Sequence, residues 1–214
     1  MPLRNRVTPF GEIAALATRG TLMGNRGCLH DGSRNVTKSS ARPAWVTCRL
    51  QWKGIRRTMM SAGKYTELFF LDEATALAAG HRPCNDCRSE RLRAFQQAWS
   101  IAVEQTAGGV TLVSRIDPVL QRDRSSGAGI QRTFAALLSD LPDGTFLQRS
   151  NEAGVARLKW CGRLHRWTPE GYTDPQKWDP AEAVTVLTPA CTVRVIRTGY
   201  VPAVHGTAKG NGTE

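Results

Sequence analysis

The sequence predicts an α+β protein, in which a short antiparallel sheet with two helices precedes a small antiparallel β-rich domain. Short segments of alternating polar and apolar residues, bounded by turn residues, fill the chain before residue 72. Helical periodicity follows as far as residue 106, and short alternating segments return after residue 139. We therefore expect domains over residues 1–116 and 139–205, a linker or loop over 117–138 and a disordered tail over 206–214.

The region before residue 72 has the features of loops and short strands, with one short helix. Residues 45–52 alternate between the two faces of a strand, and Lys53-Gly54 is a turn sequence after which the chain is expected to return as a hairpin. The expected elements are a helix over 12–18, a loop over 21–42, hairpin strands over 45–52 and 55–60, and a third strand over 65–71.

Two helices have clear local signals. Asp72 is a preferred N-cap residue and Gly80 a preferred C′ residue, which predicts a helix over 73–79. A second helix is expected over 89–106, because apolar residues recur at i+3, i+7 and i+11 from Leu92. These two helices flank a short loop that carries two cysteines.

The second half of the chain is expected to form a small antiparallel sheet or barrel. Cys161-Gly162 fits a two-residue hairpin turn between two strands. Residues 123–129 are rich in Ser and Gly and have the composition of an exposed linker. The expected strands cover residues 146–149, 156–160, 164–167, 184–187 and 192–196.

Positive charge is concentrated near the N-terminus. The 214 residues carry a net charge of +11, and residues 1–60 contain eleven Lys or Arg against only Glu12 and Asp31. Such a concentration is typical of a surface that binds phosphate groups, so nucleic acid is the expected partner. The chain lacks a P-loop, a His-Glu-x-x-His motif and a Gly-x-Ser-x-Gly motif, so ATP use and the corresponding hydrolase classes have no support.

The cysteines predict a metal site. No apolar run is long enough to span a membrane and no secretory signal is recognisable, so we expect a cytoplasmic protein with reduced thiols. Cys84 and Cys87 have the Cys-x-x-Cys spacing with which two thiolates share one tetrahedral zinc ion. Zinc is therefore the expected cofactor, and a redox dithiol is the alternative interpretation.

The segment from Phe69-Phe70-Leu71-Asp72-Glu73-Ala74 through Ala79-Gly80-His81-Arg82-Pro83-Cys84-Asn85-Asp86-Cys87 resembles the second half of the Ada-type zinc domain of bacterial alkylation repair. The resemblance covers about residues 22–95, and the whole chain is similar to small bacterial proteins of this layout. It implies a DNA partner and further ligands on an upstream loop. These would be Cys28 and then His30, with Cys48 and His81 as alternatives.

Arginines near this loop and the preceding hairpin are the candidate nucleic-acid contacts: Arg26, Arg82, Arg88, Arg91, Arg56 and Arg57. The function that we expect is zinc-dependent nucleic-acid binding, with DNA favoured, in repair or processing. The first alternative is a zinc-thiolate methyl acceptor. It is less favoured because the chain lacks the upstream Cys-x-x-x-Cys pair of that family. The second alternative is a zinc-stabilised protein-interaction module.

Overall fold

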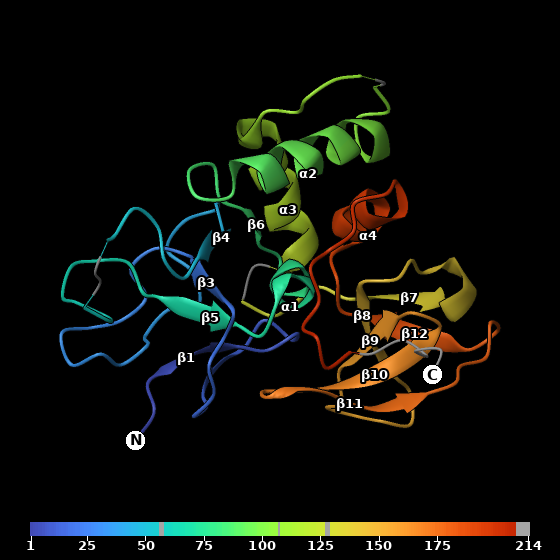
Figure 1. Cartoon of the computed structure of the whole chain (residues 1–214), viewed down its shortest axis with the longest axis horizontal. Coiled ribbons are helices and arrows are strands. Elements are labelled where there is room, and N and C mark those ends of the chain that lie inside the picture. The colour runs from blue at the N-terminus through green and yellow to red at the C-terminus, as the bar shows by residue number, and fades with distance from the viewer. Residues whose placement is uncertain (56–57, 107, 127–128, 209–214) are drawn as a thin grey trace.

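The structure, a computed structural model, describes residues 1–55, 58–106, 108–126 and 129–208. These ranges contain two six-stranded sheets and four α-helices, so the expected α+β class is confirmed. In Figure 1 the N-terminal sheet lies at the left and the C-terminal sheet at the lower right, with the helices between and above them. None of the described helices combines the length and the apolar composition needed to cross a bilayer.

The N-terminal sheet is mixed and not antiparallel as expected, with the strand order β2-β1-β5-β3-β4-β6. The pairs β1–β5 and β4–β6 are parallel, and the other neighbours are antiparallel. Parallel neighbours require a crossover connection, so this sheet brings together residues far apart in the chain. Its strands are β1 (Arg4–Val7), β2 (Ile13–Ala15), β3 (Leu22–Asn25), β4 (Val46–Arg49), β5 (Leu68–Phe70) and β6 (Arg82–Pro83).

The C-terminal sheet is antiparallel throughout, as expected, with the order β11-β10-β9-β8-β12-β7. Cys161 and Gly162 have φ angles of 48° and 72°, the left-handed values of a type I′ turn, so the predicted hairpin turn is confirmed. The strands are β7 (Phe134–Leu137), β8 (Thr145–Arg149), β9 (Arg157–Trp160), β10 (Arg163–Thr168), β11 (Gly171–Gln176) and β12 (Ala183–Val186).

Both predicted helices are present, and their ends follow the local signals. Asp72 caps α1 (Glu73–Ala78), because its Oδ1 accepts a hydrogen bond from the backbone N–H of Thr75 at 2.8 Å. Gly80 has φ +79°, and a Cβ at this position would lie 2.5 Å from Arg124 Cδ, so only glycine fits. The second helix, α2 (Ser89–Ala102), is shorter than expected, because it ends four residues before residue 106.

The other two helices, α3 (Val113–Arg124) and α4 (Ala190–Arg197), occupy segments for which other structure was expected. The segment over 117–138, expected as a linker or loop, contains most of α3, whose Leu120 is fully buried, and also contains β7. The expectation of a strand over 192–196 is also wrong. Its alternating apolar residues lie on α4, which packs on α2 and α3.

Three expectations for the N-terminal region are wrong as well. The segment over 21–42, expected as a loop, contains β3, which pairs with β4 and β5. The segment expected as a helix over 12–18 contains β2, which pairs with β1 and buries Ile13. A seven-residue helix has little intrinsic stability, so strand pairing prevails. The hairpin return over 55–60 contains no strand among its described residues, and β4 pairs with β3 and β6 instead. A disordered tail was expected over 206–214. Ala208 in this segment is buried, and residues 209–214 lie outside the described ranges.

Buried clusters join the two halves of the chain. One cluster contains Leu77 of α1 and Phe95 of α2 together with Val195 of α4. A second cluster contains Leu71, next to α1, together with Phe146 of β8. Apolar surface of both halves is therefore removed from water in the same places, and the position of α1 depends on the C-terminal half.

The side chain of Glu73 is the polar counterpart of this shared core. Its carboxylate is completely buried and accepts hydrogen bonds from Arg88, Arg91, the hydroxyl of Tyr200 and the backbone N–H of Ala203, at 2.6–2.9 Å. Burial favours the neutral acid, but the neighbouring Arg88, the Ala203 N–H and Arg91 outweigh it, so the pKa of Glu73 is lowered. The ionised carboxylate therefore links α1, α2 and the C-terminal segment.

We expect Glu73→Gln to destabilise the fold by about 3–5 kcal/mol, because it leaves buried guanidinium charge without its anion. Urea unfolding at pH 7 measures this. The matched control is Glu90→Gln, an exposed residue of α2, which should change little. Because the folded-state pKa of Glu73 is the lower one, its contribution is present above pH 4.5 and is lost as the pH falls through the folded-state value. A difference between the two variants that persists undiminished in acid would contradict this role.

Candidate metal centre

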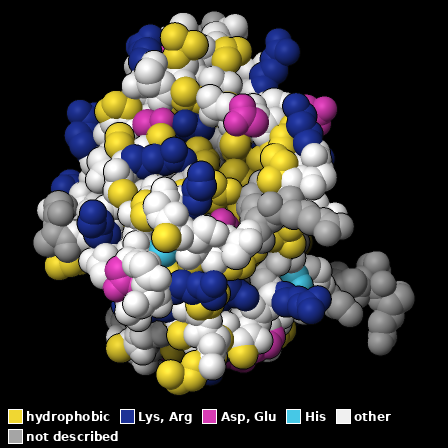
Figure 2. Space-filling model, turned by 90° about the vertical axis from the view of Figure 1, so that its left-hand side faces the viewer, with side chains coloured by type: hydrophobic (Ala, Val, Ile, Leu, Met, Phe, Trp, Pro, Cys, Tyr) yellow, Lys and Arg dark blue, Asp and Glu magenta, His cyan; other side chains and the backbone are white. Residues whose placement is uncertain are grey.

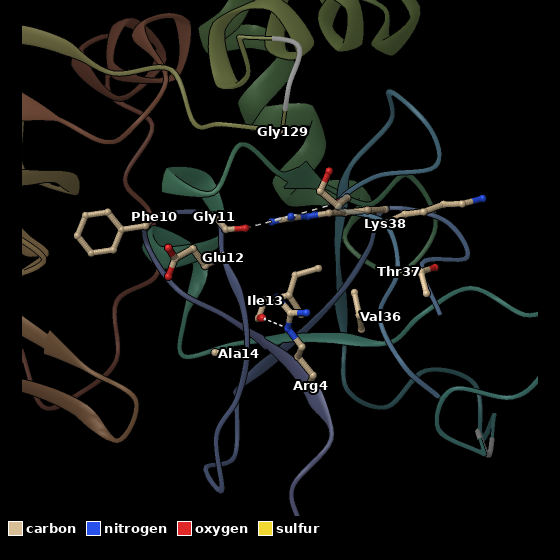
Figure 3. Close-up of a pocket in the computed structure, with 12 residues that line it drawn as sticks. Arg4, Phe10, Gly11, Glu12, Ile13, Ala14, Val36, Thr37, Lys38 and Gly129 are labelled. Atoms are coloured by element: carbon tan, nitrogen blue, oxygen red, sulfur yellow. Dashed lines mark hydrogen bonds between the residues drawn. The ribbon is translucent and has the colours of Figure 1, made fainter. Parts of the chain in front are cut away.

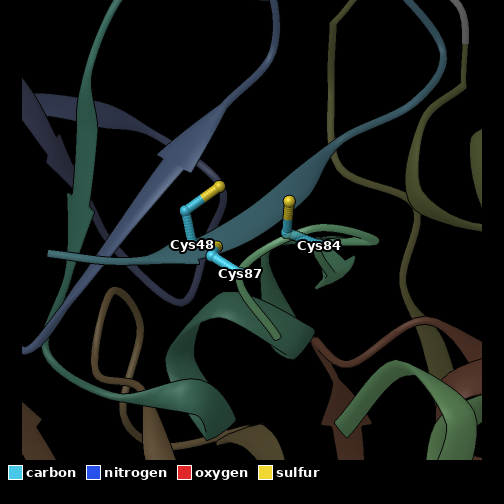
Figure 4. Close-up of side chains that lie close together, drawn as sticks. All are labelled: Cys48, Cys84 and Cys87. Carbon is cyan, nitrogen blue, oxygen red and sulfur yellow. The ribbon is translucent and has the colours of Figure 1, made fainter. Parts of the chain in front are cut away.

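Cys48, Cys84 and Cys87 lie together although they come from separate parts of the chain. Cys48 is on β4, Cys84 follows β6, and Cys87 lies in the turn that leads into α2. The parallel pairing sets Thr47 opposite Pro83, so the residues that follow these two are neighbours. The three sulfur atoms all lie within 4.8 Å of one another (Figure 4). This is the one group of three such ligands found among the described residues.

Cys84 is the most acidic of the three thiols. A hydrogen bond from the Cys48 thiol, with further bonds from the backbone N–H groups of Cys87 and Asp86, lowers the pKa of Cys84 to about 5. The same contact with Cys84, together with burial, raises the pKa of Cys48. Burial also raises the pKa of Cys87, although the Arg49 N–H donates to its sulfur at 3.3 Å. A cation shared by the three sulfurs would favour ionisation of all of them.

The side chain of Arg88 connects the two segments that carry Cys48 and Cys87. Its Nη1 donates to Thr47 Oγ1 at 2.6 Å, and its Nη2 donates to Glu73 Oε1 at 2.8 Å. Thr47 directly precedes Cys48, and Arg88 directly follows Cys87. The hydrogen bond from Arg88 to Thr47 therefore holds β4 against the start of α2, close to the three sulfurs.

A cavity of about 630 Å³ opens beside the three sulfurs, and all three cysteines line it. The lining also includes the cationic Arg42 and Lys53, the aromatic Trp52 and Tyr65, and the acidic Asp86. The Lys53 Nζ lies 5.5 Å from the centre of the Trp52 ring, within the range of a cation–π contact. A ligand in this cavity would meet thiols, an aromatic face and positive charge together.

The upstream residues that the resemblance indicated do not belong to this group. The His30 ring is buried, with Nδ1 2.6 Å from Thr66 Oγ1 and Nε2 3.2 Å from the Ser61 carbonyl oxygen. Cys28 Sγ lies 3.7 Å from the His30 carbonyl oxygen. His81 is also buried, and its Nε2 accepts a hydrogen bond from Arg26 Nε at 3.2 Å. In the structure, Cys48 takes the place proposed for Cys28 and His30.

Most of the arginines expected to bind phosphate have internal partners. Arg26, Arg82 and Arg88 are buried, with at most 7% of their surface exposed. Arg82 donates two hydrogen bonds to Asp117 at 2.6 and 2.8 Å. Arg91 is 38% exposed and is paired with Glu73. Arg82, Arg88 and Arg91 are therefore engaged in ion pairs with carboxylates of the chain, whereas Arg26 has no such pair among the described residues. Arg56 and Arg57 lie outside the described residues.

Three cysteine sulfurs fit a thiophilic metal ion, because thiolates are preferred ligands of zinc and of softer ions. Cys48 was only an alternative at the level of sequence, since its spacing from Val46 and Leu50 is that of a buried strand thiol. The signal that identifies it is the pairing of β4 with β6, which no local pattern reveals.

Comparison of the chain with models of protein families, with curated proteins and with solved structures gives no match. The resemblance to the Ada-type domain therefore has no support beyond the segment that carries it. What the structure adds is the group of three cysteines and the cavity beside it.

We expect Cys84 in chelator-treated protein to react with iodoacetamide down to about pH 5–6, since its thiolate is populated above a pKa of about 5. Cys161 is the internal control, because it is exposed and its pKa is raised. Its labelling should already decline below about pH 9, because its pKa is raised above the ordinary value. Peptide mass spectrometry after timed labelling measures both sites in one sample. Identical pH profiles at the two cysteines would contradict the assignment of Cys84 as the acidic thiol.

Proposed function

We propose that the protein binds zinc through Cys48, Cys84 and Cys87 and uses the adjoining cavity to bind nucleic acid, with DNA favoured, in repair or processing. The observation that carries the proposal is the meeting of three sulfurs, within 4.8 Å of one another, at the wall of a cavity with cationic and aromatic residues. Bound zinc would keep the thiolates ionised and would connect β4 to the start of α2. Its binding free energy would then contribute to folding.

The cavity lining supports nucleic acid as the ligand. Trp52 is partly exposed, and Arg49 and Lys53 both lie within 6 Å of its ring centre. Aromatic side chains stack on bases and neighbouring cations bind phosphates, a combination typical of single-strand binding. Figure 2, a view of the side that carries the N-terminal sheet, shows many more basic than acidic side chains. Positive charge over this face would attract the phosphate backbone.

A second function, alkyl transfer onto Cys84, is favoured by one observation. Cys84 combines the lowered pKa with a position in the cavity wall. In this reaction the Cys84 sulfur forms a bond to the methyl carbon of a phosphotriester while the carbon–oxygen bond breaks, leaving a thioether and a phosphodiester anion. Mass spectrometry after incubation with methylated DNA separates the two functions. Transfer adds a methyl group to the Cys84 peptide, whereas binding leaves the peptide unchanged.

We expect Cys48→Ser and Cys84→Ser each to lose bound zinc and to lower the melting temperature, because each removes one of the three sulfurs. The loss of zinc affinity should exceed the 10–100-fold typical of residues that only support a ligand. Elemental analysis and competition with a chelator measure this. Cys28→Ser is the matched control, since it removes a thiol outside the group. Zinc loss in Cys28→Ser with zinc retained in Cys48→Ser would overturn the assignment of the ligands.

We expect binding of single-stranded DNA that weakens steeply with salt. Lys53→Gln should reduce the slope of log K against log salt by about one, because it removes one phosphate contact. Trp52→Ala should cost about 1–3 kcal/mol of binding free energy at every salt concentration, through lost stacking. Fluorescence anisotropy with a labelled oligonucleotide measures both effects. Arg93→Gln, an exposed position on α2, is the control of equal charge change. Equal losses in Arg93→Gln and Lys53→Gln would remove the cavity from the proposal.

A further inference from the structure

A second cavity, of about 530 Å³, shares no lining residue with the three-cysteine cavity. Figure 3 shows Phe10, Gly11 and Glu12 on one side and Lys38 on the other, with Arg4 below. Three basic side chains line it, and Glu12 is the one acidic residue among the lining. The side chains of Arg4 and Lys38 are exposed.

The third basic residue, Arg26, lies behind this cavity in the interior. It is 1% exposed and lines the cavity wall. Its Nε donates to His81, and its Nη1 donates to the carbonyl oxygen of Gly11 at 3.1 Å. Its Nη2 is buried and has no hydrogen-bond partner in the structure. A buried guanidinium normally has all of its donors satisfied, so this nitrogen requires an explanation.

A second buried arginine lies close to Arg26. The two guanidinium carbons of Arg26 and Arg124 are each 3.9 Å from the centre of the Trp45 ring. Arg124 is 3% exposed and donates to the Gly80 carbonyl oxygen at 3.0 Å. In the described part of the chain, neither arginine forms an ion pair with a carboxylate. Asp117 acts on Arg124 electrostatically, but both of its oxygens are bound to Arg82.

The interior beside this cavity therefore carries positive charge that no ion pair of the described residues balances. Burial, with a contribution from Arg124, lowers the pKa of Arg26 to about 9, which reflects the same unbalanced charge. Buried charges in folded proteins are usually paired, because an isolated ion loses its hydration without compensation. The contact with Trp45 compensates in part, since the face of an indole ring attracts cations. An anion in the cavity would complete the compensation.

We propose that this cavity binds a phosphate group, with Arg4 and Lys38 as direct contacts and Arg26 as the buried charge behind them. The hydroxyl groups of Thr37 and Ser39 also line the cavity and would donate hydrogen bonds to phosphate oxygens. The volume exceeds that of a single phosphate, so a phosphorylated small molecule fits as well. This site is separate from the proposed nucleic-acid surface and does not depend on it.

Titration calorimetry with inorganic phosphate, on the full chain in chloride buffer, tests the proposal. We expect saturable binding of phosphate. The single variants Lys38→Gln and Arg4→Gln should each weaken this binding about tenfold, since each removes one charge-assisted contact. Both residues are exposed, so both variants should fold. Arg26→Gln should abolish binding, and its circular dichroism shows whether it is folded. No saturable binding, or the same affinity in Lys38→Gln and Arg4→Gln as in the unchanged protein, would overturn the proposal.

Two controls identify the source of the phosphate and keep the sites apart. Arg93→Gln should leave phosphate affinity unchanged, since this exposed residue does not line the cavity. A loss in Arg93→Gln equal to that in Lys38→Gln would mean a general effect of net charge and would overturn the proposal. Competition by a short oligothymidylate would identify the nucleic-acid backbone as the source. Its failure to compete would identify a free phosphate or a phosphorylated small molecule, and either result supports a phosphate site.

Discussion

The burial of the Glu73 carboxylate is the constraint on which most of the structure depends. A completely buried carboxylate is stable only when its hydrogen bonds and its charge are satisfied, and here the partners come from α2 and from the C-terminal segment. Arg88, one of these partners, also binds Thr47. Thr47 and Arg88 are the chain neighbours of Cys48 and Cys87. The geometry of the sulfurs is therefore tied to packing that involves both ends of the chain.

Elements with strong local signals could be predicted from the sequence. Asp72 and Gly80 mark the two ends of α1 by their side-chain acceptor and by positive φ, which are properties of single residues. The apolar stripe that begins at Leu92 predicted α2 because its period is helical. The prediction of a strand over 192–196 is wrong, because the apolar side chains of these five residues also fit one face of a short helix. Only its packing against α2 and α3 decides in favour of a helix.

The candidate site was predicted only where its residues are adjacent in the chain. Cys84 and Cys87 form a motif, whereas Cys48 reaches them through a parallel strand pair that joins residues more than thirty positions apart. Sequence also does not separate a buried arginine from an exposed one, since both fit the same composition. The charge excess of the first sixty residues therefore overstates the positive surface, because Arg26 is internal.

The internal arginines connect this charge to the architecture. Arg26 directly follows β3 and Arg124 is the last residue of α3, and both guanidinium carbons lie 3.9 Å from the centre of the Trp45 ring. The two guanidinium charges repel each other. Hydrogen bonds from Arg124 to the carbonyl oxygens of Gly80 and Pro43 hold the Arg124 side chain in place against this repulsion. An anion beside Arg26 would convert this contact from a net repulsion into an attraction between α3 and the sheet. The phosphate proposed for this cavity would then stabilise the junction of the two halves as well as occupy a binding site, because the same guanidinium serves both.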